Sequence, residues 1–384
     1  MTTQPVSRRR LLAWGLGGGA AALAAGATGV ELVLHDVLPG HDVDLVAASG
    51  SQVPGVRVVD TGVNPEDLAA SWFRPLRPPN PEGVRASARA FGAAYDLIAG
   101  GSYDIVHNHA FDVPAIEGGR RLSCPVVHSI HVPHDPVVAA CLQEAAGWAK
   151  PPWVAVISES QRAGWSAHVS IDAVLRPGVP VRRVPWSAQA GDALLFAGRL
   201  SPEKGALEAI DIAGRAGRGL VIAGGPYDPA YAEAVKRAAE GRDVTLAGPL
   251  VRRKLWQVMA TSAALVFPSA WEEPFGLVVA EAQAAGCPVV GYRRGALTEI
   301  IDDGVTGAAV DPGDVQSAVL AVNHLERFDR AACRRHAEER LDVPPMIAAH
   351  LALYERAVAG PAFPLGARSG AQQGLSYNRP GGIA

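Results

Sequence analysis

The sequence predicts an α/β protein made of two doubly wound, Rossmann-like domains that face each other across a cleft. Short apolar runs alternate with longer Ala-rich amphipathic stretches, which is typical of parallel strands joined by right-handed helical crossovers. The alternation stops at residues 174–186, a segment with three prolines, and then starts again. The 384 residues are enough for two such domains, each with its own core.

The first domain is expected to cover residues 1–183. After the N-terminal segment, buried strands are predicted at residues 44–48, 56–59, 105–107, 126–130 and 154–157, with helices at 83–99 and 136–146. Asp42-Val-Asp44 mimics a metal-binding DxD motif, but it lies at the head of a strand, opposite the end where such sheets bind ligands. We therefore interpret it as structural and expect no metal site.

Two interpretations of the N-terminus remain open. Residues 10–14 suit a first buried strand, followed by a glycine loop at 15–19 and a helix at 30–38. Alternatively, Ser7-Arg-Arg-Arg10 before an uncharged stretch resembles a twin-arginine export signal. That stretch is too rich in Gly and Ala for a membrane span. The first interpretation completes the sheet and predicts a cytoplasmic protein, whereas the second predicts export.

The second domain is expected to cover residues 184–345. Its strands are predicted at residues 193–197, 220–223, 244–247, 264–268 and 288–292. A last helix, residues 346–358, is expected to pack back on the first domain, and the Gly-, Ser- and Pro-containing tail at 359–384 is expected to be disordered.

Two carboxylates and three amides gather where a strand passes into a helix of the second domain. Glu273 lies at the mouth of the predicted helix and Glu281 follows eight residues later, so both can face one elongated ligand. The backbone N–H groups of Phe275, Gly276 and Leu277 form an anion site at the helix N-terminus. A polyol that bears phosphate would satisfy both kinds of group. An exposed acidic loop beside a helix start is the alternative, and it explains Glu281 poorly.

Two cations follow another strand of this domain. Ser201 suits an N-cap and Pro202 a first helical residue, which puts Lys204 in the first turn. A cation there opposes the helix dipole unless an anion binds nearby, and Arg199 can reach the same spot. Such a pair would stabilise a departing diphosphate. The alternative is a solvated basic pair balanced by Glu203.

Gly198-Arg199…Glu203-Lys204-Gly205, followed by Glu273-Pro-Phe-Gly…Glu281, resembles the retaining GT-B glycosyltransferases of family 4, the glycosyl transferases group 1. The resemblance extends to about Arg356. It implies a GT-B fold and transfer of a sugar from a nucleotide diphosphate sugar to a hydroxyl of a small-molecule or glycan acceptor. Family frequency favours UDP as the carrier. The resemblance implies neither a metal nor another cofactor.

The resemblance also implies roles for the residues that match its motifs. Arg199 and Lys204 would hold the donor diphosphate, Glu273 the sugar hydroxyls and Glu281 the ribose. The amides of the Phe275-Gly276-Leu277 turn would contact sugar and phosphate. Leu250, after another strand, matches the segment that lies against the base.

On the acceptor side, two predicted strands put histidines at their carboxyl ends, where such sheets bind ligands. By resemblance, His131 would lie beside the reacting sugar and His109 on the acceptor side. Gly18 and Gly19 match the family's first glycine loop, although a long Ala/Gly stretch separates them from the next helix, unlike the usual pattern.

The composition excludes several partners and leaves two alternatives. A formal net charge of −3 gives no reason to expect nucleic acid, and peripheral membrane contact stays open. Four well-separated cysteines without a CxxC fit a reducing compartment. The alternative enzyme is a nucleotide-sugar 2-epimerase of the same architecture. The alternative non-enzyme is an exported two-domain sugar-binding protein, which would not need the two cations.

Overall fold

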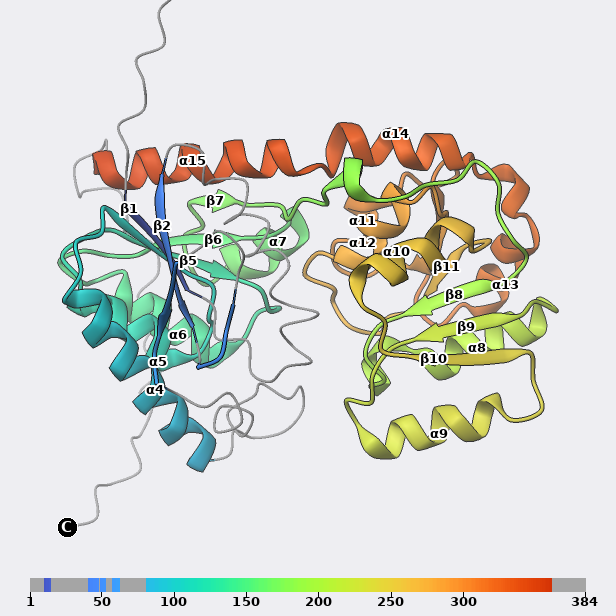
Figure 1. Ribbon diagram of the computed structural model, residues 1–384, viewed down its shortest axis with the longest axis horizontal. Helices are drawn as coiled ribbons and strands as arrows, with labels where there is room; N and C mark the ends of the chain where they lie inside the picture. The colour runs from blue at the N-terminus through green and yellow to red at the C-terminus, as the bar shows by residue number, and fades with distance from the viewer. Residues whose placement is uncertain (1–9, 15–40, 48, 53–56, 63–80, 361–384) are drawn as a thin grey trace, which may run out of the picture.

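The computed structural model describes residues 10–14, 41–47, 49–52, 57–62 and 81–360. Within them, two parallel sheets form two lobes, each with its own helices (Figure 1). The predicted α/β fold with two doubly wound sheets is confirmed. None of the helices in the described ranges is long and apolar enough to span a bilayer.

The first sheet has the strand order β3-β2-β1-β4-β5-β6-β7 among the described residues, and all its pairings are parallel. Arg10–Trp14 forms β1 between β2 and β4, as the strand interpretation predicts. The glycine loop with Gly18 and Gly19, the helix expected at 30–38 and the tail from 361 lie outside the described residues. The strands are β1 Arg10–Trp14, β2 Asp42–Ala47, β3 Arg57–Asp60, β4 Ile105–Asn108, β5 Val126–Ile130, β6 Trp153–Val156 and β7 Ala173–Val174.

The second sheet has the order β10-β9-β8-β11-β12-β13. Along β8, Leu194 and Phe196 belong to one hydrophobic cluster, whereas Leu195 and Ala197 belong to another. Successive strand residues point to opposite faces, so helices cover this sheet on both sides. The strands are β8 Leu194–Ala197, β9 Leu220–Ala223, β10 Val244–Gly248, β11 Leu265–Phe267, β12 Val289–Tyr292 and β13 Gly307–Val310.

The helices that matter for the site follow strands of the two sheets or cross between the lobes. α15 begins beside the second lobe and runs over the first (Figure 1), where Leu353, Tyr354 and Ala357 join the core of the first sheet. The helices are α4 Pro81–Ala99, α5 Val113–Glu117, α6 Pro136–Ala145, α7 Glu159–Ser166, α8 Ala206–Arg215, α9 Pro229–Ala239, α10 Arg252–Thr261, α11 Leu277–Ala284, α12 Leu297–Ile300, α13 Val315–Asn323, α14 Arg330–Arg340 and α15 Val343–Ala359. Short 3-10 turns are η1 Gly118–Arg121, η2 Val181–Arg183, η3 Pro202–Lys204 and η4 Leu325–Arg327.

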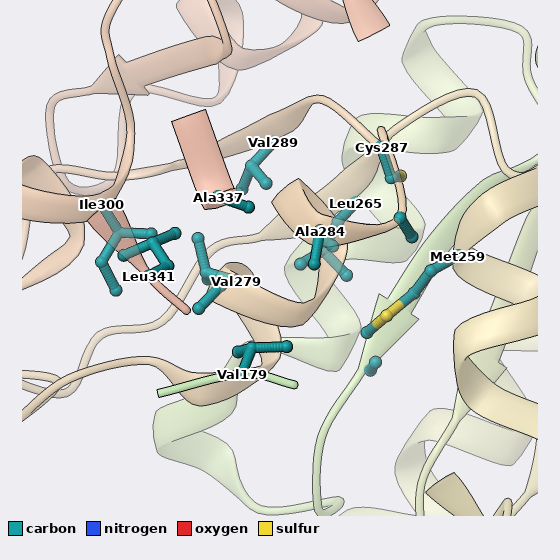
Figure 2. Packing of buried hydrophobic residues seen from close by; sticks show 14 of the residues in the cluster. Val179, Met259, Leu265, Val279, Ala284, Cys287, Val289, Ile300, Ala337 and Leu341 are labelled. Carbon is teal, nitrogen blue, oxygen red and sulfur yellow. The ribbon is translucent and has the colours of Figure 1, made fainter. Parts of the chain in front are cut away.

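Residues 174–186, where the predicted alternation stops, begin at the end of β7 in the first lobe and then pack against the second lobe. Val179 and Val181 are fully buried, and the N–H of Val179 donates to the Leu341 carbonyl at 2.7 Å. Figure 2 shows Val179 and Leu341 in one cluster with Val279 of α11. Since α15 begins just after Leu341, the outgoing and returning segments of the chain lie side by side at this crossing.

Candidate active site

The two predicted motifs of the second lobe meet at a partly buried ion pair. Lys204 Nζ lies 2.5 Å from Glu273 Oε2, and each side chain is only 14% exposed. The backbone joins the motifs as well, because the Ala270 N–H donates to the Glu203 carbonyl at 2.9 Å. The chain turns at Gly205 with φ +78°, and a Cβ there would lie 2.3 Å from the Pro268 carbonyl oxygen. Only glycine leaves room for this close approach, so the backbone conformation at Gly205 fixes the position of the preceding Lys204.

The helix expected from Pro202 was placed wrongly. Pro202–Lys204 is a single 3-10 turn, and α8 begins at Ala206. The Ser201 side chain caps no amide; its hydroxyl donates to Glu203 at 2.6 Å. A left-handed residue cannot continue an α-helix, so Gly205 separates the turn from the helix. Lys204 therefore occupies a rigid turn and not a helix first turn.

Arg199, at the end of β8, has two partners. Its guanidinium pairs with Glu203 at 3.0 Å and lies over the Tyr227 ring, 4.5 Å from the ring centroid. Burial acts to raise the pKa of Glu203, but the Ser201 hydroxyl and Arg199 outweigh it and lower that pKa. Glu203 thus pairs with Arg199, as the alternative interpretation of a balanced basic pair expects, whereas Lys204 pairs with Glu273. Tyr227 was not predicted from the sequence. The Gly-Gly-Pro turn that precedes it, after β9, was the available signal, because such a turn lets two segments approach closely.

Glu281, on α11, is nearly fully buried and pairs with a different cation. Its Oε1 lies 3.1 Å from Arg252 Nε, and the Arg252 guanidinium lies over the Trp256 ring at 5.8 Å. Burial raises the pKa of Glu281, while Arg252 and then Trp256 lower it. Arg252 was not predicted. A cation at the first position of α10, where the helix dipole disfavours it, was the available signal.

Helix α11 begins shortly after Glu273 in the sequence. Gly276 has φ +91° and is the N-cap, so no side chain caps this helix in the described structure. Phe275 is buried in the core, whereas Leu277 and Leu250 are partly buried against the same cluster. The predicted turn amides therefore lie on a loop anchored by apolar side chains on either side of the glycine.

Backbone contacts from the segment before α12 fix the loop that carries Glu273. The Ala296 N–H donates to the Glu273 carbonyl at 2.9 Å, and the Gly295 N–H donates to Glu272 at 3.0 Å. Gly295 has φ +56°, and a Cβ there would lie 2.3 Å from the Glu273 carbonyl oxygen. The loop and the α12 segment are thus in direct backbone contact.

In the first lobe, the structure brings His109 and His131 together. His109 Nδ1 lies 3.0 Å from His131 Nε2, so one ring nitrogen donates and the other accepts. Burial, together with a smaller effect of the nearby His350, lowers the pKa of His131 to about 4. Both rings are therefore neutral near pH 7, because burial also lowers the pKa of His109 well below its usual range.

The other histidines of the same strands are core groups. His107 bonds the Tyr354 hydroxyl of α15 at 2.6 Å, and His128 bonds the Asn108 amide at 2.7 Å. Both rings are fully buried, because they lie within β4 and β5 and not beyond the strand ends. Asp44 accepts from Tyr103 at 2.8 Å and binds Arg57, which are structural contacts.

Comparison with known proteins finds a matching family model and related enzymes. The family model described as "Glycosyl transferases group 1" matches residues 187–340. The chain is 30% identical over 305 residues to a D-inositol 3-phosphate glycosyltransferase of Mycolicibacterium smegmatis, covering 67% of this chain and 68% of that relative. It is 29% identical over 346 residues to a glycogen synthase of Mycobacterium tuberculosis, covering 81% and 82%.

Solved structures share the two-lobed fold at low sequence identity. A sucrose-phosphate synthase of Thermosynechococcus elongatus superimposes with a TM-score of 0.73 at 18% identity, covering 91% of this chain and 98% of that one. Anabaena HepE in complex with UDP and glucose gives a TM-score of 0.71 at 17% identity, covering 91% and 100%.

Proposed function

The chain belongs to the glycosyl transferases group 1 and is a hexosyltransferase with the GT-B fold, and from this we propose its donor, its stereochemistry and its site. The proposed reaction moves a sugar from a nucleotide diphosphate sugar to an acceptor hydroxyl, with the anomeric configuration retained. The observation that carries the proposal is the pairing of Lys204 with Glu273 at 2.5 Å. It supports the proposal because the cation assigned to the phosphate and the carboxylate assigned to the hydroxyls lie side by side.

The donor would lie along the second lobe. Arg199 and Lys204 bind the diphosphate, Glu273 binds sugar hydroxyls and Glu281 binds the ribose diol. The amides around Gly276 add donors that need no reorganisation, since the left-handed backbone already sets their direction. Arg252 holds the Glu281 carboxylate at 3.1 Å, so the ribose would meet an oriented acceptor.

In the transfer step, the bond between the anomeric carbon and the donor phosphate oxygen breaks. The acceptor oxygen bonds to the same carbon on the same face, and its proton passes to the departing phosphate oxygen. The products are the glycoside and the nucleoside diphosphate. Arg199 and Lys204 stabilise the charge that develops on the diphosphate, so the protein itself supplies the cations for this step. For this reason we propose a metal-independent reaction.

The neutral His131–His109 pair would face the sugar from the first lobe. With its pKa lowered to about 4, His131 offers a hydrogen bond to a sugar hydroxyl without adding a positive charge near the anomeric carbon. A cation there would oppose the positive charge that develops on the sugar in the transition state.

UDP is the proposed carrier, and a polyol or glycan hydroxyl the proposed acceptor. The choice of UDP is supported by the UDP complex of HepE and by family frequency. The acceptor class is supported by the relatives' names, which refer to D-inositol 3-phosphate and to glycogen.

A donor and acceptor panel tests the function. The protein is incubated with glucose linked to UDP, GDP, ADP or TDP and with D-inositol 3-phosphate, simple polyols or short α-glucans, and products are identified by mass spectrometry. We expect a new glycoside with a UDP-sugar, a rise in melting temperature on adding UDP, and an NMR coupling constant that shows the donor's anomeric configuration. Absence of both UDP binding and glycoside formation, or an inverted product, contradicts the proposal.

A further inference from the structure

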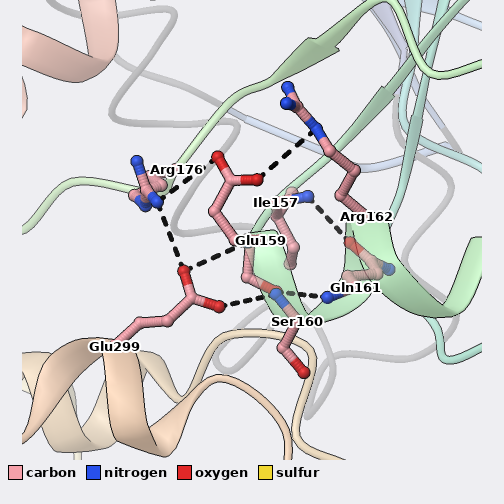
Figure 3. A network of polar contacts seen from close by, with 8 residues as sticks. Ile157, Glu159, Ser160, Gln161, Arg162, Arg176 and Glu299 are labelled. Atoms are coloured by element: carbon pink, nitrogen blue, oxygen red, sulfur yellow. Dashed lines mark hydrogen bonds and ion pairs between the residues drawn. The ribbon is translucent and has the colours of Figure 1, made fainter. Parts of the chain in front are cut away.

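Outside the site described above, a carboxylate of the second lobe contacts the first lobe. Glu299 of α12 accepts from the backbone N–H of Ser160 at 2.7 Å and of Glu159 at 3.1 Å, the first residues of α7 in the other lobe. The same carboxylate lies 3.3 Å from Arg176 Nη2 (Figure 3). Its side chain is 20% exposed, so the contact is largely shielded from water.

This joint exists because α7 leaves two amides unsatisfied. Ser158 is the N-cap, and its hydroxyl accepts from the Gln161 N–H at 3.0 Å. One hydroxyl serves one amide, so the N–H groups of Glu159 and Ser160 need another acceptor. A carboxylate at a helix N-terminus forms charge-assisted hydrogen bonds and complements the helix dipole. Here that carboxylate comes from the opposite lobe.

From α7, buried contacts lead to the acceptor-side histidines. Gln161 Nε2 donates to the Val132 carbonyl at 2.6 Å, and Trp165 Nε1 donates to the same oxygen at 3.1 Å. Both side chains are buried, and Val132 directly follows His131. A shift of α7 would therefore move the backbone that carries His131.

From α12, backbone contacts lead to the donor-side carboxylate. The Glu299 N–H donates to the Ala296 carbonyl at 2.9 Å, and the Ala296 N–H donates to the Glu273 carbonyl at 2.9 Å. Gly295 leaves no room for a Cβ against the same carbonyl. A shift of α12 would therefore move the Glu273 loop.

We propose that Glu299 is a positioning residue for the transfer reaction, which sets the placement of the His131 segment relative to the Glu273 loop by tying α7 to α12. Its carboxylate accepts from the α7 amides, and its own backbone leads to the Glu273 loop. Ile157, just before α7, adds apolar packing, because it belongs to the same buried cluster as Leu297 and Ile300 of α12. The inference rests on the proposed function, because it assumes that these two segments contact one substrate pair.

The test compares Glu299→Ala and Glu299→Gln with the wild-type chain. The Gln variant keeps one acceptor oxygen, so it should retain more activity than the Ala variant. Glu233→Ala is the matched control, because Glu233 pairs with Arg237 on the surface of α9 within one lobe. Four quantities are measured: hydrogen exchange of the Glu159 and Ser160 amides, the dissociation constant of UDP, and kcat and donor KM with the active donor and acceptor from the panel.

We expect faster exchange at both amides in Glu299→Ala, and a kcat that falls roughly tenfold to a hundredfold. The UDP dissociation constant should stay within about twofold, because the donor site lies in one lobe and only its placement relative to the other lobe has changed. Glu299→Gln should fall between wild type and the Ala variant, and Glu233→Ala should behave as wild type.

Three results would overturn the proposal. They are unchanged exchange at Glu159 and Ser160, faster exchange with unchanged kcat, and a loss of UDP affinity that accounts for the whole loss of rate. A wild-type chain that transfers no sugar in the panel overturns the proposed function and Glu299's positioning role with it. The exchange measurement still reports separately whether the carboxylate joins the lobes.

Discussion

Each acidic or basic side chain proposed to hold the donor already has a partner of opposite charge. Lys204 pairs with Glu273, and Arg252 pairs with Glu281. A half-buried charge without a partner is strongly disfavoured, so these pairs keep the site stable without substrate. Donor binding would then replace or extend existing contacts.

The first prediction separates stability from chemistry at this pair. Lys204→Met should lower the free energy of unfolding by about 1–3 kcal/mol, because the Glu273 carboxylate loses its cation. The transfer rate should fall by about a hundredfold or more. In Lys204→Met combined with Glu273→Gln, stability should recover while transfer stays lost. Urea unfolding measures the stability and initial rates measure the transfer, with Lys236→Met of α9 as the control. Full activity in Lys204→Met would contradict the assignment of Lys204.

The second prediction concerns the pH dependence of nucleotide binding. Burial raises the pKa of Glu281 and Arg252 lowers it, so Arg252→Met should raise that pKa further. As the pH falls from about 7 to about 5, more of the variant's Glu281 is protonated and a weaker acceptor for the ribose. UDP titrations should show a steeper loss of affinity than in wild type. The neighbouring exposed Arg253→Met is the control, and parallel pH curves for both variants would contradict the role of Arg252.

The sequence pointed to single candidate residues but not to their contact partners. Lys204 and Glu273 followed from motifs whose spacing limits the possible chemistry. Tyr227, Arg252 and Glu299 were not predicted, because each acts through a contact between segments distant in sequence. Such contacts depend on how the elements pack, which a local pattern does not specify.

At the scale of elements, the strands with large apolar residues were predicted within one or two residues. β13, Gly307–Val310, was missed because its side chains are small, and β7 because it has two residues. Small residues are needed in β13, where a Cβ on Gly307 would lie 2.0 Å from the Val289 carbonyl oxygen. The turn at Gly205 was also missed, since its left-handed backbone follows from close approach to Pro268 and not from local propensity.

The third prediction uses two glycines with similar backbone conformations. Gly295 has φ +56° and Gly313 has φ +82°, so Ala at either position is disfavoured by about 1 kcal/mol. Around Gly313 there is open space, whereas at Gly295 a Cβ would press on the Glu273 carbonyl. Gly295→Ala should therefore lose stability beyond Gly313→Ala and should also lose transfer by about tenfold or more. Equal stability and equal rates in the two variants would refute the steric account.

At the scale of the whole molecule, α15 covers a group of buried neutral histidines in the first lobe. His107 bonds Tyr354 of α15, and His350 of the same helix bonds the Met346 carbonyl. Burial lowers the pKa of His128 to about 3 and that of His350 to about 4. Because these rings are buried under α15 in their neutral form, protonating them would destabilise the folded state.

The fourth prediction is an acid-sensitive fold. A histidine with a lowered folded-state pKa contributes stability above its unfolded pKa of about 6.5, and this is lost as the pH falls toward its folded pKa. Each such ring should reduce the free energy of unfolding by about 1.4 kcal/mol per pH unit in that window. The difference in unfolding free energy between pH 7 and pH 5 should be smaller in His350→Gln than in the wild-type chain, by the contribution of one histidine. Exposed His324→Gln should leave it unchanged, and an unchanged difference in His350→Gln would count against the account.

The central claim is that one nucleotide diphosphate sugar lies across the paired charges of the second lobe. A crystal structure of the protein with UDP and its donor sugar tests this most directly. We predict the diphosphate within hydrogen-bond distance of Arg199 and Lys204, sugar hydroxyls on Glu273 and the ribose on Glu281. A nucleotide bound in another place, or bound here with its ribose and diphosphate away from these four side chains, would contradict the account.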